Sequence, residues 1–220
     1  MLRATFAMVI LLAAGCQHAS APAPLNSFII TNVSLLDGTG APARPAVVHI
    51  VGERIERVDE PARLPARVGE RVVDGGGLTL APGFIDTHSH ADRALRRGSD
   101  ASGALSQGIT TVVVGQDGGS PFPLSQFFAA LEQRGLPLNV ASYVGHGTIR
   151  SRVLGDDYKR HATAAEILRM KERLQQELSA GALGLSSGLE YDPGIYSAPA
   201  EVIELANVTA AARGRYISHI

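Results

Sequence analysis

From Phe84 onward the chain alternates short apolar segments with amphipathic segments, and this alternation is the feature that most constrains its fold. The clearest apolar segment is residues 109–114, a β-branched run that is typical of a buried parallel strand. The next segment repeats apolar residues at i, i+3, i+4 and i+7, as one face of a helix does: Leu124, Phe127, Phe128 and Leu131. Strands that alternate with helices predict an α/β fold with a parallel sheet.

Each of the five predicted strands is followed or ended by polar side chains. The first strand is expected to begin at Phe84 and to be buried, and the others are expected at residues 109–114, 138–144, 182–185 and 215–220. The polar residues are His88 with His90, Asp117, His146, Tyr191 and His219. In a (β/α)8 barrel the carboxyl ends of the strands meet around one site, and this placement favours a barrel over an open sheet. Because such a barrel needs roughly 250 residues, residues 81–220 predict a partial TIM-type barrel with about five of the eight strands.

The pair His88 and His90 suggests a metal site at the end of the first strand. Side chains at i and i+2 of a strand leave on the same face, so both imidazoles are expected to point one way. Two imidazole nitrogens that converge suit a divalent transition metal, with zinc the usual choice. The simpler alternative is a polar strand end with no metal.

Residues 27–80 are expected to form a separate small β unit. Short apolar runs alternate there with turn residues, and Gly52 to Arg54 separates two runs as in a hairpin. A unit of this size buries little core, so it is expected to lean on other structure. His49 lies within one of the strands, and no partner motif near it indicates more than a structural role.

The N-terminal residues 1–16 are typical of a bacterial lipoprotein signal peptide. Arg3 precedes an apolar run over residues 4–14, and Gly15 then stands before Cys16, the residue expected to carry lipid. An ordinary signal peptide, in which Cys16 is incidental, is the alternative. Residues 17–26 are rich in Ala, Ser and Pro and are expected to form a tether. The chain is therefore expected to be exported, either periplasmic or anchored to a bacterial membrane through Cys16.

Composition excludes some classes of function. The net charge is -1 and no long basic run is present, so nucleic acid is not an expected partner. Cys16 is the single cysteine, which excludes an internal disulfide bond and a zinc cluster of several cysteines.

Several stretches in order along the chain resemble the D-aminoacylases, the N-acyl-D-amino-acid deacylases of the amidohydrolase superfamily. They span most of residues 27–220, so the resemblance is more specific than any one motif. The opening residues 32–40 also resemble part of the small β-sandwich of that family, which makes 27–80 a partial sandwich and 81–220 a truncated hydrolase barrel. The other matching stretches are Ala81-Pro82-Gly83-Phe84-Ile85-Asp86-Thr87-His88-Ser89-His90, residues 107–115, Gly145-His146-Gly147-Thr148-Ile149-Arg150, residues 184–194 and Tyr216-Ile217-Ser218-His219.

The resemblance implies a zinc-dependent hydrolase that acts on a small N-acyl-D-amino acid. It implies that His88, His90 and His219 are metal ligands. Asp117 stands where the family usually has a cysteine ligand, and a carboxylate can also bind zinc, although Asp117 in Gln-Asp-Gly-Gly is equally suited to a tight turn. The resemblance further implies that Tyr191 contacts the substrate carboxylate, and the alternative is a loop tyrosine packed on its ring with its hydroxyl in water. His146 is expected to orient a metal ligand, or else to be a hydrogen-bonded loop histidine.

The chain also departs from the family in length. Family members are about twice as long, and the resemblance places a further histidine ligand and the catalytic aspartate beyond residue 220. The chain is therefore expected to be an N-terminal fragment with little activity alone. Two alternatives stay open: a cyclic-amide hydrolase like the dihydropyrimidinases, although residues 183–191 lack the lysine usual there, and a lipoprotein remnant without catalysis.

Overall fold

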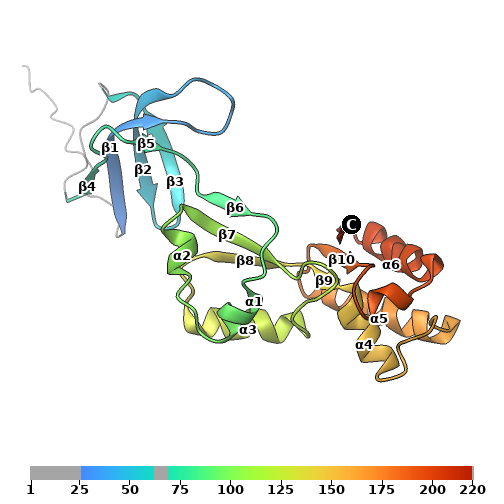
Figure 1. Cartoon of the computed structure of the whole chain (residues 1–220). Helices are drawn as coiled ribbons and strands as arrows, with labels where there is room; N and C mark the ends of the chain where they lie inside the picture. The colour runs from blue at the N-terminus through green and yellow to red at the C-terminus, as the bar shows by residue number, and fades with distance from the viewer. Residues whose placement is uncertain (1–25, 62–68, 220) are drawn as a thin grey trace, which may run out of the picture. The chain divides into compact units, whose positions relative to one another are not determined.

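The computed structural model describes residues 26–61 and 69–219 of the chain. Cys16, the predicted signal peptide and nearly all of the predicted tether lie outside the described residues. Contacts within the chain divide it into two compact units, Met1–Pro82 and Gly83–Ile220 (Figure 1). In the described parts of both units, no helix combines the length and the apolar character that crossing a membrane requires.

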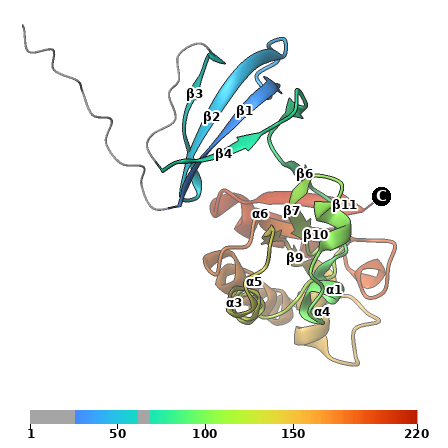
Figure 2. The same cartoon turned by 90° about the vertical axis from the view of Figure 1, so that its left-hand side faces the viewer.

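The first unit is a single mixed sheet in its described residues. Strand β1 lies at its centre, antiparallel to β2 and parallel to β4 and β5, while β3 pairs antiparallel with β2. The order β3-β2-β1-β4 can be followed in Figure 2. The strands are β1 (Ser27–Leu35), β2 (Arg44–Val51), β3 (Arg54–Asp59), β4 (Arg71–Asp74) and β5 (Thr79–Leu80).

The small core of this unit contains Leu35, Ala46 and Val48, which are buried against partly buried neighbours. The hairpin predicted at Gly52 is confirmed, since β2 and β3 pair on either side of it and Gly52 has a φ of 59°, which glycine adopts without strain. These described residues form one sheet and therefore one layer, and the partial β-sandwich that the resemblance implies stays a prediction.

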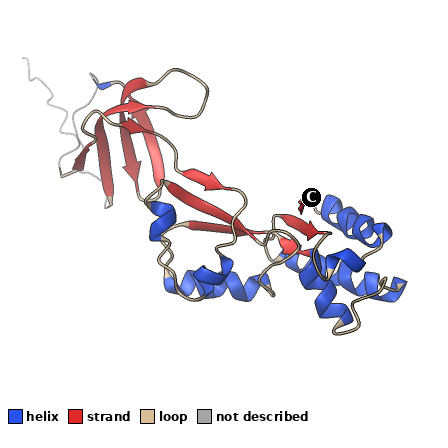
Figure 3. Ribbon diagram, in the orientation of Figure 1, coloured by secondary structure: helices blue, strands red, loops and turns tan. Residues whose placement is uncertain are grey.

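The second unit alternates strands and helices, as the sequence predicts (Figure 3). Its strands form two parallel sheets, β6-β7-β8 and β9-β10-β11, in which spatial order follows chain order. Strands added in sequence order are typical of barrels, whereas a doubly wound sheet reverses its order. Among the described residues β6 and β11 do not pair, and no closed barrel is formed. The strands are β6 (Phe84–Asp86), β7 (Ile109–Val114), β8 (Asn139–Ser142), β9 (Val144–Gly145), β10 (Gly184–Gly188) and β11 (Arg215–His219).

Two strand predictions need correction. The segment predicted as one strand over residues 138–144 is divided at Tyr143, because its first part pairs with β7 and its second part with β10. The predicted strand at 182–185 begins and ends later, as β10. Gly184 allows this pairing, since a Cβ atom there would lie 1.8 Å from the Arg215 carbonyl oxygen.

The helices of the second unit pack against these strands around a core that includes Val114, Leu124, Met170, Leu185 and Leu205. The capping box predicted at Thr163 and Glu166 is present at the start of α5. The helices are α1 (Asp92–Arg96), α2 (Ser102–Leu105), α3 (Leu124–Arg134), α4 (His146–Leu154), α5 (Ala164–Ser179) and α6 (Pro199–Ala211), with the 3₁₀ turn η2 (Gly194–Tyr196) before α6.

The prediction that the first strand of this unit is buried is wrong. Phe84 and Ile85 are 63% and 61% exposed. The reason is that β6 pairs with β7 along one edge, while its other edge has no strand beside it in the described residues. A continuous apolar run indicates a strand but does not tell which neighbours cover it.

Candidate metal centre

Three imidazoles surround the carboxylate of Asp117 in the second unit. The His90 Nε2 atom lies 3.0 Å from Asp117 Oδ2, and His88 Nε2 lies 3.4 Å from Asp117 Oδ1. The His219 Nδ1 atom lies 3.4 Å from the same Oδ1. The chain thus brings together side chains that follow β6, follow β7 and end β11.

The distances from Asp117 to its three neighbours are close to those between two ligands of a tetrahedral ion. Two ligands bonded to one zinc at about 2.0–2.1 Å lie about 3.3 Å apart, close to the observed separations of 3.0–3.4 Å from Asp117 to its neighbours. Candidate ligand atoms of His88, His90 and Asp117 all lie within 4.8 Å of one another. Imidazole nitrogen and carboxylate oxygen are both zinc donors, so these residues fit the predicted metal.

Backbone geometry places Asp117 at the centre of the cluster. Its φ is 56°, in the left-handed region that aspartate tolerates better than most residues. Glycines let the neighbouring loops approach: a Cβ on Gly145 would lie 2.3 Å from Gly118 O, and one on Gly188 would lie 2.4 Å from Asp117 O. The loop that carries Asp117 is therefore held between the strand ends beside it.

The histidine pair reaches Asp117 from a loop and not from a strand. Strand β6 ends at Asp86, so the prediction that the strand pleat directs both imidazoles to one face is wrong. Hydrogen bonds to the end of β7 hold this loop instead: Ser89 N donates to Val113 O, and the buried Gln116 amide donates to Thr87 O. The rings of His88 and His90 lie 5.4 Å apart, and their side chains are 47% and 64% exposed.

Tyr191 lies at the edge of this cluster, beside His219. The Tyr191 hydroxyl is 2.8 Å from His219 Nε2, and the two rings lie 4.8 Å apart. Glu190, which the sequence analysis does not single out, has Oε1 3.5 Å from the same nitrogen. The nitrogen of His219 that faces away from Asp117 is therefore fixed by outer partners, which sets the ring orientation.

His146 belongs to a different cluster. It is fully buried, and its Nε2 is 2.8 Å from Glu201 Oε1, while Arg150 donates to Glu201 Oε2. Burial raises the pKa of Glu201, but the hydrogen bonds from His146 and Arg150 outweigh it and hold the pKa below its usual value. The role of His146 in orienting a metal ligand stays a prediction.

The sequence contained partial signals for the residues of this buried cluster. Arg150 ends the Gly-His-Gly-Thr-Ile-Arg stretch, and Glu201 lies in the first turn of the helix that Pro199 begins. A charged residue on a helix reads as solvent-facing by default, and only the fold shows that these two face each other.

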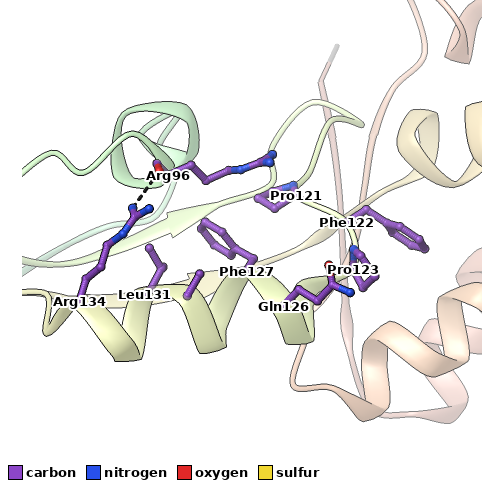
Figure 4. Close-up of a pocket in the computed structure, with 9 residues that line it drawn as sticks. Arg96, Pro121, Phe122, Pro123, Gln126, Phe127, Leu131 and Arg134 are labelled. Carbon is purple, nitrogen blue, oxygen red and sulfur yellow. Dashed lines mark hydrogen bonds between the residues drawn. The ribbon is translucent and has the colours of Figure 1, made fainter.

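A small cavity of about 220 Å³ adjoins the metal cluster. Asp117 and Tyr191 line it, together with backbone of Gly147 and Gly188. A separate pocket of about 300 Å³ lies between α1 and α3, where Arg134 donates to the Arg96 carbonyl oxygen beside Phe127 (Figure 4). None of the predicted site residues lines this second pocket, whereas Asp117 and Tyr191 line the cavity beside the metal cluster.

Residues 71–216 match the sequence profile of the amidohydrolase family (Amidohydro_3). The match covers well over half of the chain, and the chain belongs to this family.

Within the family, the chain is a homologue of the N-acyl-D-amino-acid deacylases. It is 38% identical over 208 residues to the N-acyl-D-glutamate deacylase of Alcaligenes xylosoxydans xylosoxydans, covering 84% of this chain and 42% of the relative. It is 32% identical over 215 residues to the D-aminoacylase of the same organism, covering 87% of this chain and 44% of the relative. The chain thus spans less than half the length of these curated relatives.

A solved structure supports the same relationship. The N-acyl-D-glutamate deacylase of Bordetella bronchiseptica, in complex with zinc and a phosphonate mimic of the tetrahedral intermediate, superposes with a TM-score of 0.80 at 39% identity. The superposition covers 88% of this chain and 44% of that protein. The prediction of homology to these deacylases, over an N-terminal portion, is confirmed.

Proposed function

We propose that this chain carries the N-terminal part of a zinc-dependent N-acyl-D-amino-acid deacylase, built on part of a TIM-type barrel. The observation that carries the proposal is the meeting of His88, His90 and His219 around Asp117. The homology to N-acyl-D-glutamate deacylase and D-aminoacylase supplies the substrate class.

The chemistry follows from the donor set. Zinc held by these side chains would lower the pKa of a bound water and polarise the amide carbonyl of the substrate. Asp117 offers two oxygens on opposite sides, one near His88 and His219 and one near His90, so its carboxylate holds the three imidazoles together. Tyr191, which lines the adjoining cavity, would donate a hydrogen bond from its hydroxyl to a substrate carboxylate.

Proton transfer is the step for which we assign no residue of this chain. Glu190 and Asp117 are the carboxylates at the cluster, and both face His219. We propose that the catalytic aspartate belongs to a segment corresponding to the part of the relatives that this chain does not match. The 220-residue chain alone is therefore expected to bind zinc and to turn over substrate slowly.

The test assays hydrolysis of N-acetyl-D-glutamate, N-acetyl-D-aspartate and a neutral N-acetyl-D-amino acid, with the L-enantiomers as controls. The zinc-loaded 220-residue chain is compared with a longer product read from the DNA downstream of codon 220. We expect about one zinc or more per chain by elemental analysis, and D-specific turnover that is much faster in the longer product than in the 220-residue chain.

A variant lacking both histidines, His88→Ala with His90→Ala, is the matched control and is expected to lose zinc and turnover. Full turnover by the 220-residue chain would refute the assignment of the proton transfer. If neither polypeptide hydrolyses substrate and neither binds zinc, the deacylase proposal is refuted and the non-catalytic alternative remains.

We also propose that the chain is exported and carries lipid at Cys16. The support is the sequence pattern of residues 1–16 alone. Mass spectrometry of the mature N-terminus in a bacterial host tests the proposal: a lipid-modified Cys16 at the N-terminus is expected. Cleavage at another site, or an unmodified Cys16, would refute it.

A further inference from the structure

Arg150, in α4, is fully buried, and its guanidinium joins four segments of the second unit. It donates to the Glu201 carboxylate and to the carbonyl oxygens of Tyr158, Arg160 and Tyr196, the first and last of these three at 3.0 and 3.2 Å. A buried guanidinium is costly unless it is paired and hydrogen-bonded. Here Nη1 donates to the Glu201 carboxylate and Nη2 lies against the three carbonyl oxygens, while the buried Nε has no hydrogen-bond partner among the described residues. Arg150 therefore ties α4 to α6, to the loop before α5 and to η2.

The contact with Tyr196 connects Arg150 to the loop that carries Tyr191. Within this loop Ile195 N donates to Tyr191 O at 2.9 Å, and Tyr191 N donates to Gly188 O at 3.3 Å. Gly194 packs so closely on the end of β10 that a Cβ there would lie 2.4 Å from Gly188 O. Residues 191–197 thus form one compact turn with Arg150 at one end and Tyr191 at the other.

Tyr158 provides a second tie to the same turn. Its ring meets the Tyr196 ring edge-on, with the ring centroids 6.0 Å apart. Its hydroxyl interacts with the carboxylate of Asp192, next to Tyr191 in the chain, and this interaction raises the pKa of Tyr158. Because Arg150 holds the Tyr158 backbone, both ties depend on one guanidinium.

We infer that Arg150 is a positioning residue, which holds Tyr191 against His219 and thereby orients this imidazole at the metal centre. The Tyr191 hydroxyl lies 2.8 Å from His219 Nε2, and His219 Nδ1 faces Asp117. An outer partner of this kind fixes the ring orientation and the tautomer of a ligand histidine, and losing it typically weakens metal binding about 10–100-fold. The inference rests on the proposed function only in taking zinc as the ion.

The test measures zinc affinity of the 220-residue chain by competition with a chelator. Arg150→Lys keeps a positive charge beside Glu201, but one ammonium must replace two guanidinium nitrogens, Nη1 at the carboxylate and Nη2 at the carbonyl oxygens. We expect Arg150→Lys and Tyr191→Phe each to weaken zinc binding about tenfold or more. The double variant is expected to be no weaker than Tyr191→Phe alone, to within about twofold, because both changes act through one contact.

Arg160→Lys is the matched control. The Arg160 side chain pairs with Asp157 and Glu166 and makes no hydrogen bond to the described residues 191–197, so zinc affinity is expected to stay within about twofold. Amide hydrogen exchange of residues 191–197 in the metal-free chain gives a second readout. Exchange is expected to be faster in Arg150→Lys and unchanged in Arg160→Lys.

Additive losses in the double variant, or unchanged exchange in a folded Arg150→Lys chain, would overturn the inference. If Arg150→Lys does not fold, Tyr158→Leu replaces it, since this change removes the ring and hydroxyl ties and leaves the backbone carbonyl for Arg150. It is expected to speed exchange of residues 191–197, and no change would count against the inference. If the unaltered chain binds no zinc, the proposed function fails, and the exchange rates alone decide the role of Arg150.

Discussion

Two clusters in the second unit use the same residue types, histidine and carboxylate, in opposite environments. His88 and His90 are about half exposed around Asp117, whose side chain is 17% exposed. His146 and Glu201 are fully buried, and Arg150 completes their cluster with a positive charge. The Arg150 guanidinium neutralises the Glu201 carboxylate, so Glu201 cannot serve as a metal ligand. The Asp117 carboxylate faces three imidazoles and has no arginine or lysine beside it in the described residues, so it can still bind a cation.

Burial and the presence of an arginine counter-charge therefore distinguish a structural ion pair from a candidate binding site. The buried cluster is expected to govern stability, and the exposed cluster is expected to govern metal binding. A substitution in one cluster should therefore change the property that this cluster governs, stability or metal binding, and leave the other unchanged.

The largest effect is expected at the buried cluster. Glu201→Ala leaves the buried Arg150 guanidinium without its counter-charge, so the free energy of unfolding should fall by about 3–5 kcal/mol. Urea denaturation at pH 7 of the metal-free chain measures it. Glu190→Ala at the exposed cluster is the matched control and should change the free energy by less than about 0.5 kcal/mol. Equal losses of unfolding free energy in both variants would contradict the view that the buried cluster governs stability.

The next effect is expected at the exposed cluster. Asp117→Ala should weaken zinc binding by about 100-fold or more, equivalent to about 2.7 kcal/mol, because it removes the donor that faces all three imidazoles. Chelator competition measures the affinity, with Glu172→Ala on α5 as the control. Unchanged zinc affinity in Asp117→Ala would show that the site lies elsewhere.

A smaller effect concerns the kind of donor at the centre. Asp117→Cys replaces a hard carboxylate with a soft thiolate, so the preference for zinc over manganese should rise by about tenfold. The backbone opposes this change, because the φ of 56° suits aspartate better than cysteine. Competition between the two ions measures the ratio, and Asp117→Asn, which keeps the backbone preference, is the control. An unchanged ratio in a folded Asp117→Cys chain would contradict Asp117 as a ligand.

The smallest effect concerns acid stability. A hydrogen bond from Arg160 holds the pKa of Glu166 well below its usual value of 4.5. The folded chain therefore binds a proton less readily than the unfolded chain, so this contribution is present above about pH 4.5 and is lost as the pH falls further.

Glu166→Gln keeps the capping box but removes the charge, so it should lower the free energy of unfolding at pH 7 by about 1 kcal/mol and flatten the acid limb. Urea denaturation between pH 3 and pH 7 measures this, with Glu172→Gln as the control. An acid limb as steep as that of the unaltered chain would contradict the assignment.

The sequence predicted the order of elements well because their signals are local. The capping box at Thr163, the apolar face of α3 and the β-branched run of β7 each lie within a few residues and appear in the structure as expected. The break at Tyr143 could not be predicted, because it arises from pairing with two different neighbours, β7 and β10.

The sequence predicted which residues meet at the candidate site, but not the backbone geometry that brings them together. His88, His90, Asp117 and His219 meet as expected, but the loop after Asp86 directs the histidine pair, and hydrogen bonds from Gln116 and Ser89 hold that loop. Such contacts join residues that lie apart in the sequence. The partners of His146 were missed for the same reason, since Glu201 is 55 residues away.

The close packing of glycines behind Asp117 has a consequence for how such a site can diversify. Backbone occupies the space that a methyl group would need at Gly118, Gly145 and Gly188, so these positions accept no larger residue without displacement of the chain. New substrate preferences, whether selected in nature or in the laboratory, are then expected from other residues that line the cavity, such as Tyr191 and Thr148.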